Sequence, residues 1–148
     1  MLEFNCRFGD PETQAIIPRL RSDLLELLWA AANGDPLPEV AWSEGPSVGV
    51  VLASKGYPAS SSKGDVISGV EQSEAIDGVE VLHAATADKN GELVTSGGRV
   101  LTVTGTGATF AEARSRAYAG VAAIKFEGEQ HRSDIALRAE QREARSAG

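Results

Sequence analysis

Cysteine is almost absent from this 148-residue chain, which contains one. A single cysteine excludes an internal disulfide, so stability must come from a packed core, which a chain of this length can bury. Basic residues are also few: 14 Lys and Arg against 21 Asp and Glu give a net charge of −7. That balance provides no global basic field, so we expect no nucleic-acid partner.

Long apolar runs are absent as well. No run in the sequence approaches the roughly 20 residues of a membrane span, and no charged-then-apolar signal peptide opens the chain. A Walker-type phosphate loop is lacking too. We therefore expect a cytoplasmic protein with no membrane partner.

Strict alternation of apolar and polar side chains over residues 2–8 predicts a β-strand. Its apolar face is expected to bury Cys6 as a small hydrophobe. Its polar face carries Glu3, Asn5 and Arg7, about 7 Å apart. A carboxylate and an amide oxygen are hard ligands that suit Mg²⁺, and a guanidinium suits a phosphate. The face could hold a metal–phosphate pair, although a half-exposed edge strand would show the same alternation.

A helix start is expected directly after this strand. Gly9 permits the turn, Asp10 can cap, Pro11 suits the first helical position and Glu12 complements the helix dipole. We therefore predict a short helix near residues 12–17.

The complete string Glu-Phe-Asn-Cys-Arg-Phe-Gly-Asp-Pro-Glu-Thr-Gln, residues 3–14, resembles the signature of the phosphoribosylamine–glycine ligases. These glycinamide ribonucleotide synthetases of purine biosynthesis are members of the ATP-grasp superfamily. The resemblance continues in family order through residues 20–24, 49–58, 64–69, 83–86, 95–101 and 132–139. Ala85 and Ala136 depart from it, since the family usually has glycine at both positions, and their local backbone geometry is therefore in question.

The resemblance implies an ATP-dependent ligase that joins glycine to 5-phosphoribosylamine through a glycyl phosphate. By the same resemblance, Glu3 and Asn5 are Mg²⁺ (or Mn²⁺) ligands that hold the ATP phosphates, and Arg7 faces the transferred phosphate. Asp10, Glu12 and Arg99 are weaker candidates for substrate contacts; Arg99 could equally be a solvated strand end. The family also needs an N-terminal domain and an ATP-grasp domain that this sequence does not contain, so we expect an inactive C-terminal fragment.

The fold is expected to be α+β, in two parts. Residues 1–45 would be the end of an ATP-grasp domain, a strand plus helices, with a helix from about Ser22 ended by Asn33-Gly34. The proline-containing segment 35–46 would be the linker. Residues 46–148 would form a mainly antiparallel, single-hybrid-like β domain with a packed helix.

Within the second part, the expected elements follow from local patterns. Residues 48–53 and 100–104 are predicted strands, and strands at 79–84 and 92–95 are expected to flank a hairpin turn at Lys89-Asn90-Gly91. A capping box, Thr109 to Glu112, starts a helix with an apolar stripe, and a polar surface helix follows Asp134.

Alternatives remain open on the sequence alone. The chain could be a non-catalytic interaction module that complements a separate ATP-grasp chain. It could also belong to another ATP-grasp ligase, such as a biotin-dependent carboxylase that shares the Glu-x-Asn-x-Arg strand, although residues 8–12 speak against that. His83 could serve in acid–base chemistry or in structure. Gly105-Thr106-Gly107 resembles a phosphate loop but lacks the third glycine.

Overall fold

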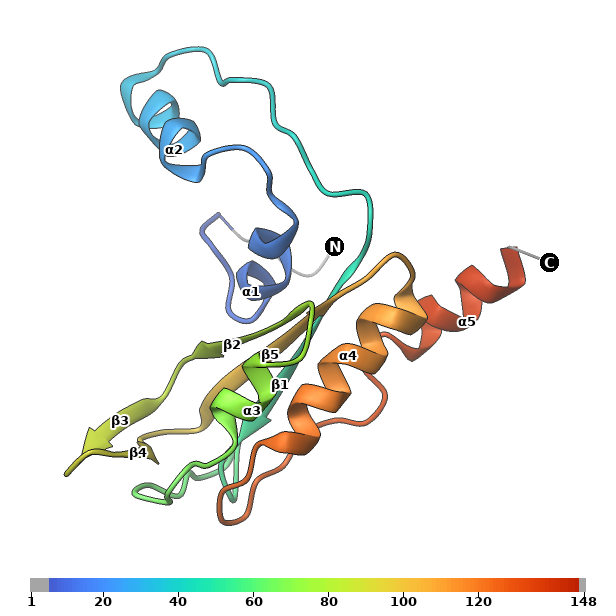
Figure 1. The fold of residues 1–148 in the computed structure, drawn as a ribbon. Helices are drawn as coiled ribbons and strands as arrows, with labels where there is room; N and C mark the ends of the chain where they lie inside the picture. The colour runs from blue at the N-terminus through green and yellow to red at the C-terminus, as the bar shows by residue number, and fades with distance from the viewer. Residues whose placement is uncertain (1–5, 147–148) are drawn as a thin grey trace.

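The computed structural model describes residues 6–146 and shows an α+β fold with antiparallel sheets (Figure 1). Its strands are β1 (Ser47–Ala53), β2 (Val79–His83), β3 (Thr86–Lys89), β4 (Glu92–Thr95) and β5 (Arg99–Thr106). Its α-helices are α1 (Glu12–Ile16), α2 (Leu24–Asn33), α3 (Val70–Glu74), α4 (Phe110–Ala123) and α5 (Leu137–Ser146), and the 3₁₀ helix η1 (Ile17–Arg19) follows α1.

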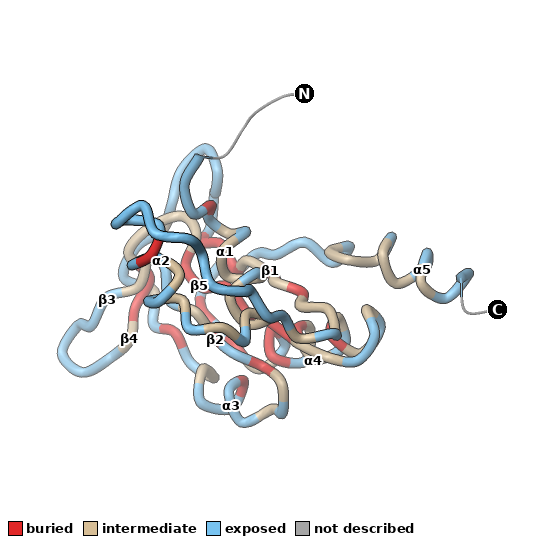
Figure 2. Tube along the Cα trace, turned by 90° about the horizontal axis from the view of Figure 1, so that it is seen from above, coloured by how far each residue is buried: buried red, intermediate tan, exposed pale blue. Residues whose placement is uncertain are grey.

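β5 is the centre of the main sheet, whose strand order is β1-β5-β2 with both neighbours antiparallel. Val103 of β5 is paired with Val50 on one side and Val81 on the other, so these three valines share one face. α4 covers that face, and Figure 2 shows buried segments along β1, β5 and α4. The core members contributed by these three elements are Val48, Val50, Leu52, Val100, Leu101, Val103, Ala113, Ala117 and Val121.

Gly105 lets α4 lie directly on the sheet. A Cβ at this buried strand position would fall on the backbone oxygen of Ala113 and the backbone nitrogen of Ala117. Gly105 is also paired with both Val48 and Val79, so it is a central strand residue. The glycine of the possible phosphate loop therefore has a packing reason to be there.

The predicted end of α2 and the predicted start of α4 are confirmed. Asp23 caps α2 by accepting hydrogen bonds from the amides of Leu25 and Glu26, and Gly34 ends it with φ +73°. α4 begins at the predicted capping box, where the Thr109 hydroxyl accepts from the Glu112 amide at 3.2 Å.

α2 stands apart from the sheet, at the end of the molecule opposite the β3–β4 hairpin (Figure 1). Its Leu25 and Trp29 side chains are each 69 % exposed. Trp42, in the segment that leads from α2 to β1, is 48 % exposed. The core therefore lies in the sheet and α4, and α2 adds a single buried residue, Ala30.

The predicted hairpin forms at the predicted turn but with a different partner strand. Asn90 and Gly91 have φ of +58° and +84°, as a two-residue turn requires, and they join β4 to β3, a separate short strand. β2 pairs with β5 instead, because Val79 and Val81 complete the apolar face under α4. The prediction of a strand over 79–84 facing 92–95 was therefore wrong in its pairing, and α3 was not predicted.

The predictions of a strand over residues 2–8 and of a buried Cys6 need correction for the residues that the structure describes. Residues 2–5 lie outside the described residues, and Cys6–Phe8 form no strand. Cys6 is exposed and Phe8 is 60 % exposed, so the expected burial of Cys6 is wrong. The five strands of the described residues all begin at Ser47 or later, so the expected opening strand is not seen in Cys6–Phe8.

α1 packs on the sheet face opposite α4. A Cβ at Gly49 of β1 would lie 3.7 Å from the Cβ of Ala15, in ordinary contact. Pro11, and not Asp10, is the residue that precedes α1, and it offers no side-chain cap. The prediction that Asp10 caps α1 is wrong, because its carboxylate accepts hydrogen bonds from the side chains of Gln14 and Arg99 instead.

In the part of the chain described, no helix is both long and apolar enough to span a membrane.

Candidate functional site

Arg99 and Asp10 connect the start of β5 with the segment that leads into α1. The Arg99 Nη2 lies 3.0 Å from the Asp10 Oδ2, and its Nη1 donates to the Asp10 backbone oxygen at 3.0 Å. Asp10 also accepts a hydrogen bond from the Gln14 amide at 2.9 Å. Two residues predicted separately as substrate contacts are thus in direct contact.

Arg7 and Glu12 gather around Gly9. A Cβ at Gly9 would overlap the Glu12 carboxylate and lie 3.2 Å from the Arg7 Nη1. Gly9 is buried although its neighbours are exposed, so the absent side chain makes room for both charged groups. The described candidates Arg7, Asp10 and Glu12 therefore lie within one short turn, beside Arg99.

A cavity of about 420 Å³ opens next to this turn, on the side of β1 that faces away from α4. Its apolar lining comes from Pro11, Val51 and Ala53. Its polar lining comes from Tyr57, Arg99, Gln130, His131 and Arg132. No Asp or Glu is among the lining residues.

Each basic side chain of the cavity is held by a carboxylate that does not itself line it. Asp10 holds Arg99, as described above. Asp134 binds the Arg132 Nε and Nη2 at 2.8 and 2.6 Å, and Glu129 lies 2.7 Å from the His131 Nδ1. A partner of this kind fixes the orientation of a charged group without occupying all of its donors.

One long-range pairing builds the wall of the cavity. Gln130 exchanges both backbone hydrogen bonds with Ala53, and its side-chain amide donates to the backbone oxygens of Ser54 at 2.9 Å and Tyr57 at 3.1 Å. Gly98 leaves room for the Tyr57 ring, since a Cβ there would lie 2.5 Å from the ring Cδ2. The glycine before Arg99 thus positions an aromatic wall beside it.

The electrostatics of the cavity come from these pairs. Hydrogen bonding to Arg132 lowers the pKa of the Asp134 carboxyl below its ordinary value, and the same bond raises the pKa of Arg132. The pair is therefore fully charged at neutral pH.

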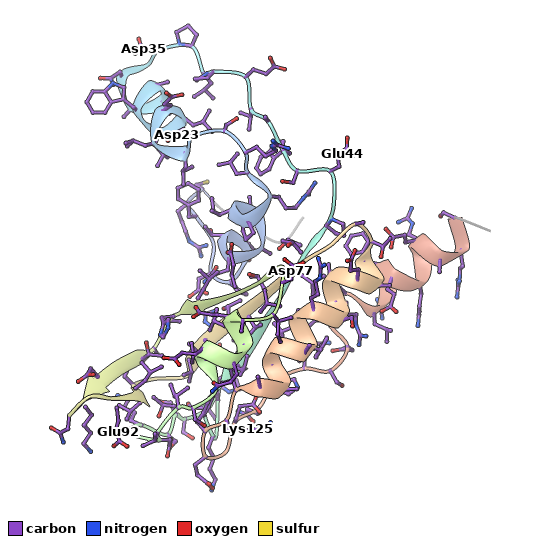
Figure 3. All side chains as sticks on the ribbon, viewed as in Figure 1. Asp23, Asp35, Glu44, Asp77, Glu92 and Lys125 are labelled. Carbon is purple, nitrogen blue, oxygen red and sulfur yellow. The ribbon has the colours of Figure 1, made fainter. Side chains whose placement is uncertain are left out.

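The acidic residues around α2 do not contribute to the cavity. Figure 3 places Asp23 and Asp35 there, away from the sheet and so away from the cavity.

Sequence reasoning did not single out Tyr57 or residues 130–132 as functional. Arg132 belongs to the segment 132–139 that resembles the family, but no role was predicted for it, and nothing in its local sequence pattern indicates a cavity. The contacts of Gln130 with Ala53, Ser54 and Tyr57 join residues 73–77 positions apart, and that separation leaves no local trace in the sequence.

The predicted metal ligands Glu3 and Asn5 lie outside the described residues. Within residues 6–146, no group of three or more His, Cys, Asp and Glu side chains could hold a metal ion. His83, exposed at the end of β2, has its Nδ1 3.0 Å from the Thr86 hydroxyl, a contact that links β2 to β3.

Comparison with known proteins gives one consistent family. A family model described as phosphoribosylglycinamide synthetase, C domain, matches residues 47–138. A phosphoribosylamine–glycine ligase of Vibrio vulnificus (strain CMCP6) is 51 % identical over 97 % of this chain and 33 % of its own length. A relative of the same name from Brucella melitensis is 50 % identical over 97 % of this chain and 34 % of its own length.

A solved structure shows the same relationship. The crystal structure of phosphoribosylamine–glycine ligase from Thermotoga maritima aligns with a TM-score of 0.76 and 37 % identity, covering 90 % of this chain and 32 % of that one. The chain thus spans about a third of the length of the relatives it matches.

Proposed function

This chain belongs to the phosphoribosylamine–glycine ligase family, and we propose that it is the C-terminal portion of an ATP-dependent ligase that joins glycine to 5-phosphoribosylamine. The observation that carries the proposal is the 51 % identity over 97 % of the chain with a ligase of that name. Because the chain spans only a third of such relatives, the substrates and the activity belong to the proposal and not to the chain alone. The cytoplasmic location expected from the sequence is part of the same proposal.

The proposed domain boundary lies at residues 45–46. Residues 1–45 would complete an ATP-grasp domain, and residues 46–148 would form the β-rich C-terminal domain of single-hybrid type. Two observations support this division: the family model begins at residue 47, and β1 begins at Ser47. The contacts of α1 with β1 and of Asp10 with Arg99 would then cross the domain boundary.

The proposed reaction has two steps. The glycine carboxylate attacks the γ-phosphorus of ATP, the bond to the bridging oxygen breaks, and ADP leaves with glycyl phosphate formed. The amine of phosphoribosylamine then attacks the glycyl carbonyl carbon, the carbon–oxygen bond to phosphate breaks, and the amine loses a proton. Catalysis of such steps depends mainly on positioning and on stabilising charge.

The opening residues fit a divalent cation by their donor chemistry. Glu3 offers a carboxylate and Asn5 an amide oxygen, and both are hard ligands of the kind Mg²⁺ or Mn²⁺ takes. A bound Mg²⁺ would neutralise phosphate oxygens of ATP. Such an ion usually has one or two protein ligands and completes its shell with phosphate and water, so two donors suffice.

The described charged residues of the turn would act on the substrates. Arg7 would stabilise the phosphoryl group as it transfers, because its planar fork matches phosphate oxygens. Asp10 and Glu12 would order this turn or contact glycine. Arg99 would contact substrate from the other domain, and its ion pair with Asp10 supports a location at the junction of the two parts.

The first test uses the chain by itself. The purified 148-residue protein should release no phosphate from ATP in the presence of glycine and phosphoribosylamine, because the ATP-grasp segments of its relatives are not in it. Phosphate release that depends on both substrates would contradict this expectation.

The second test restores the context, with this chain replacing the corresponding third of the Vibrio vulnificus ligase. The chimera should form glycinamide ribonucleotide. Glu3→Ala should reduce ATP turnover and raise the Mg²⁺ concentration needed, whereas His83→Ala should not, since the His83 ring is hydrogen-bonded to Thr86 and does not line the cavity. Near-normal kinetics of both variants at limiting Mg²⁺ would show that the metal assignment is wrong.

A further inference from the structure

We propose that the cavity beside α1 binds a sugar phosphate, with its phosphate held between Arg99 and Arg132. The inference rests on the proposed function, which makes phosphoribosylamine a substrate, and it deepens that function by adding Arg132, His131 and Tyr57 to the site. The argument starts from the donors that the cavity presents.

Its two guanidinium groups come from separate parts of the fold, Arg99 from the start of β5 and Arg132 from the segment between α4 and α5. A guanidinium has five N–H donors. The Asp10 contacts engage two of those on Arg99, and the Asp134 contacts engage two of those on Arg132. Each group therefore keeps donors for a ligand, while its carboxylate fixes its plane.

The donors of the lining suit an anion, although Asp10, Asp134 and Glu129 pair with them from outside the cavity. Arg99, Arg132 and His131 line the cavity, and no carboxylate does. Phosphate oxygens suit arginine forks because two parallel N–H groups match their spacing. His131, held at Nδ1 by Glu129, has Nε2 as its other polar atom and adds a third basic group.

The remaining surface suits the sugar. Val51, Ala53 and Pro11 form an apolar floor, and the Tyr57 ring forms a wall over Gly98. A volume of about 420 Å³ lies within the common range for small-molecule sites and leaves room for a pentose beside its phosphate. The apolar floor and the Tyr57 ring can contact the C–H groups of a pentose, a contact that free phosphate cannot make.

The cavity also lies beside the turn that carries Arg7 and Asp10, where the proposed ligation would take place. Pro11 lines it, Asp10 binds the Arg99 that lines it, and Arg7 lies in the same turn. A sugar phosphate bound here by its phosphate would place its other end near the turn that carries the ligase signature. The ATP phosphates are assigned to the opening strand and would not occupy this cavity.

The test is a titration of the isotopically labelled chain followed by NMR, with ribose 5-phosphate as the probe. We expect shifts at the amides of Tyr57, Arg99 and His131 and at the Nε of both cavity arginines. Ribose should give none of these shifts, and inorganic phosphate should give those at the arginines only. An equal or larger response of the same signals to metal-free ATP would overturn the assignment to a sugar phosphate.

Variants make the test specific. Arg132→Gln should weaken ribose 5-phosphate binding about tenfold, as expected for the loss of a charge-assisted contact. This side chain is 74 % exposed, so the fold should be unaffected, and the amide spectrum checks that. Arg99→Gln should weaken binding similarly. Arg145→Gln, which replaces an exposed arginine of α5, should leave binding within twofold.

Two results would overturn the inference: no shift at the cavity at 10 mM ribose 5-phosphate, or equal affinity in Arg132→Gln and the unchanged chain. The titration measures binding and not ligation, so it is independent of the chimera test. An active chimera without this binding would refute the cavity assignment only. Binding together with an inactive chimera would refute the proposed function and leave the site in place.

Discussion

Asp10 and Arg99 are 89 positions apart in the sequence, and their side chains form an ion pair of 3.0 Å. Both side chains are partly exposed, at 47 and 39 %, so the pair contributes little to folding stability. Its importance is geometric. It fixes the turn that carries the ligase signature against the first residue of β5, next to the cavity.

Ala136 offers a test of the departures from the family pattern. It has φ +60°, a left-handed conformation that costs a non-glycine residue about 1–2 kcal/mol. Glycine removes that strain but adds about 0.4–1 kcal/mol of unfolded-state entropy cost. Ala136→Gly should therefore stabilise the chain by about 0.5–1 kcal/mol, measured by urea unfolding followed by circular dichroism.

Ala85→Gly is the matched control, because Ala85 is the other departure and is not among the positive-φ residues of the described part. It should destabilise the chain by about 0.4–1 kcal/mol. Stabilisation by both substitutions would show that the backbone at Ala136 is not the cause.

Gly105→Ala should be strongly destabilising. The added methyl group would meet the backbone of Ala113 and Ala117, which cannot move without displacing α4. We expect a loss of about 2 kcal/mol or more in the free energy of unfolding. Gly49→Ala in the neighbouring strand meets nothing nearer than 3.5 Å and should change stability by less than about 1 kcal/mol. Similar losses for both variants would contradict close packing of α4 on β5.

Hydrogen exchange should separate the start of the chain from its core. Residues 2–8 should exchange fast, and residues 48–53 and 100–104 should exchange slowly, because the latter are paired within the main sheet. More generally, the first 45 residues should be the least stable part and residues 47–126 the folded core. Equal protection of both regions in a monomer would contradict the view that the opening segment needs a partner from a larger enzyme.

Acid titration should identify the Arg132–Asp134 pair. The Asp134 carboxyl has a folded-state pKa below its ordinary value of 3.8, because Arg132 hydrogen-bonds the ionised form. The stability it contributes is present above pH 3.8 and is lost as the pH falls through the lowered folded-state pKa. An NMR titration should find a midpoint below 3.8 in the unchanged chain, and Arg132→Gln should move it upward. A midpoint unaffected by this substitution would show that the pair does not form in solution.

The sequence predicted what depends on neighbours along the chain. The cap at Thr109, the stop at Gly34 and the turn at Asn90-Gly91 are local, and each was found where expected. The apolar stripe of α4 was also correct, since helical spacing determines it.

What the sequence did not predict depends on distant partners. β2 pairs with β5 and not with β4, because a strand pattern does not specify its neighbour. The cavity was missed for the same reason: its wall depends on the pairing of Ala53 with Gln130, and its basic groups come from separate segments. Arg99 was a candidate because of its position after the glycine pair at residues 97–98, but only the fold shows that Arg132 lies beside the same cavity.

The two tryptophans of the chain, Trp29 and Trp42, both precede β1 and are both largely exposed. Indole fluorescence will therefore report on two places: Trp29 reports on α2 and on whatever covers it, and Trp42, which lines a pocket with Ser47 and Phe110, reports on the contact with the starts of β1 and α4. A blue shift on adding the rest of a ligase would be a direct optical record of its docking onto α2, with no label required.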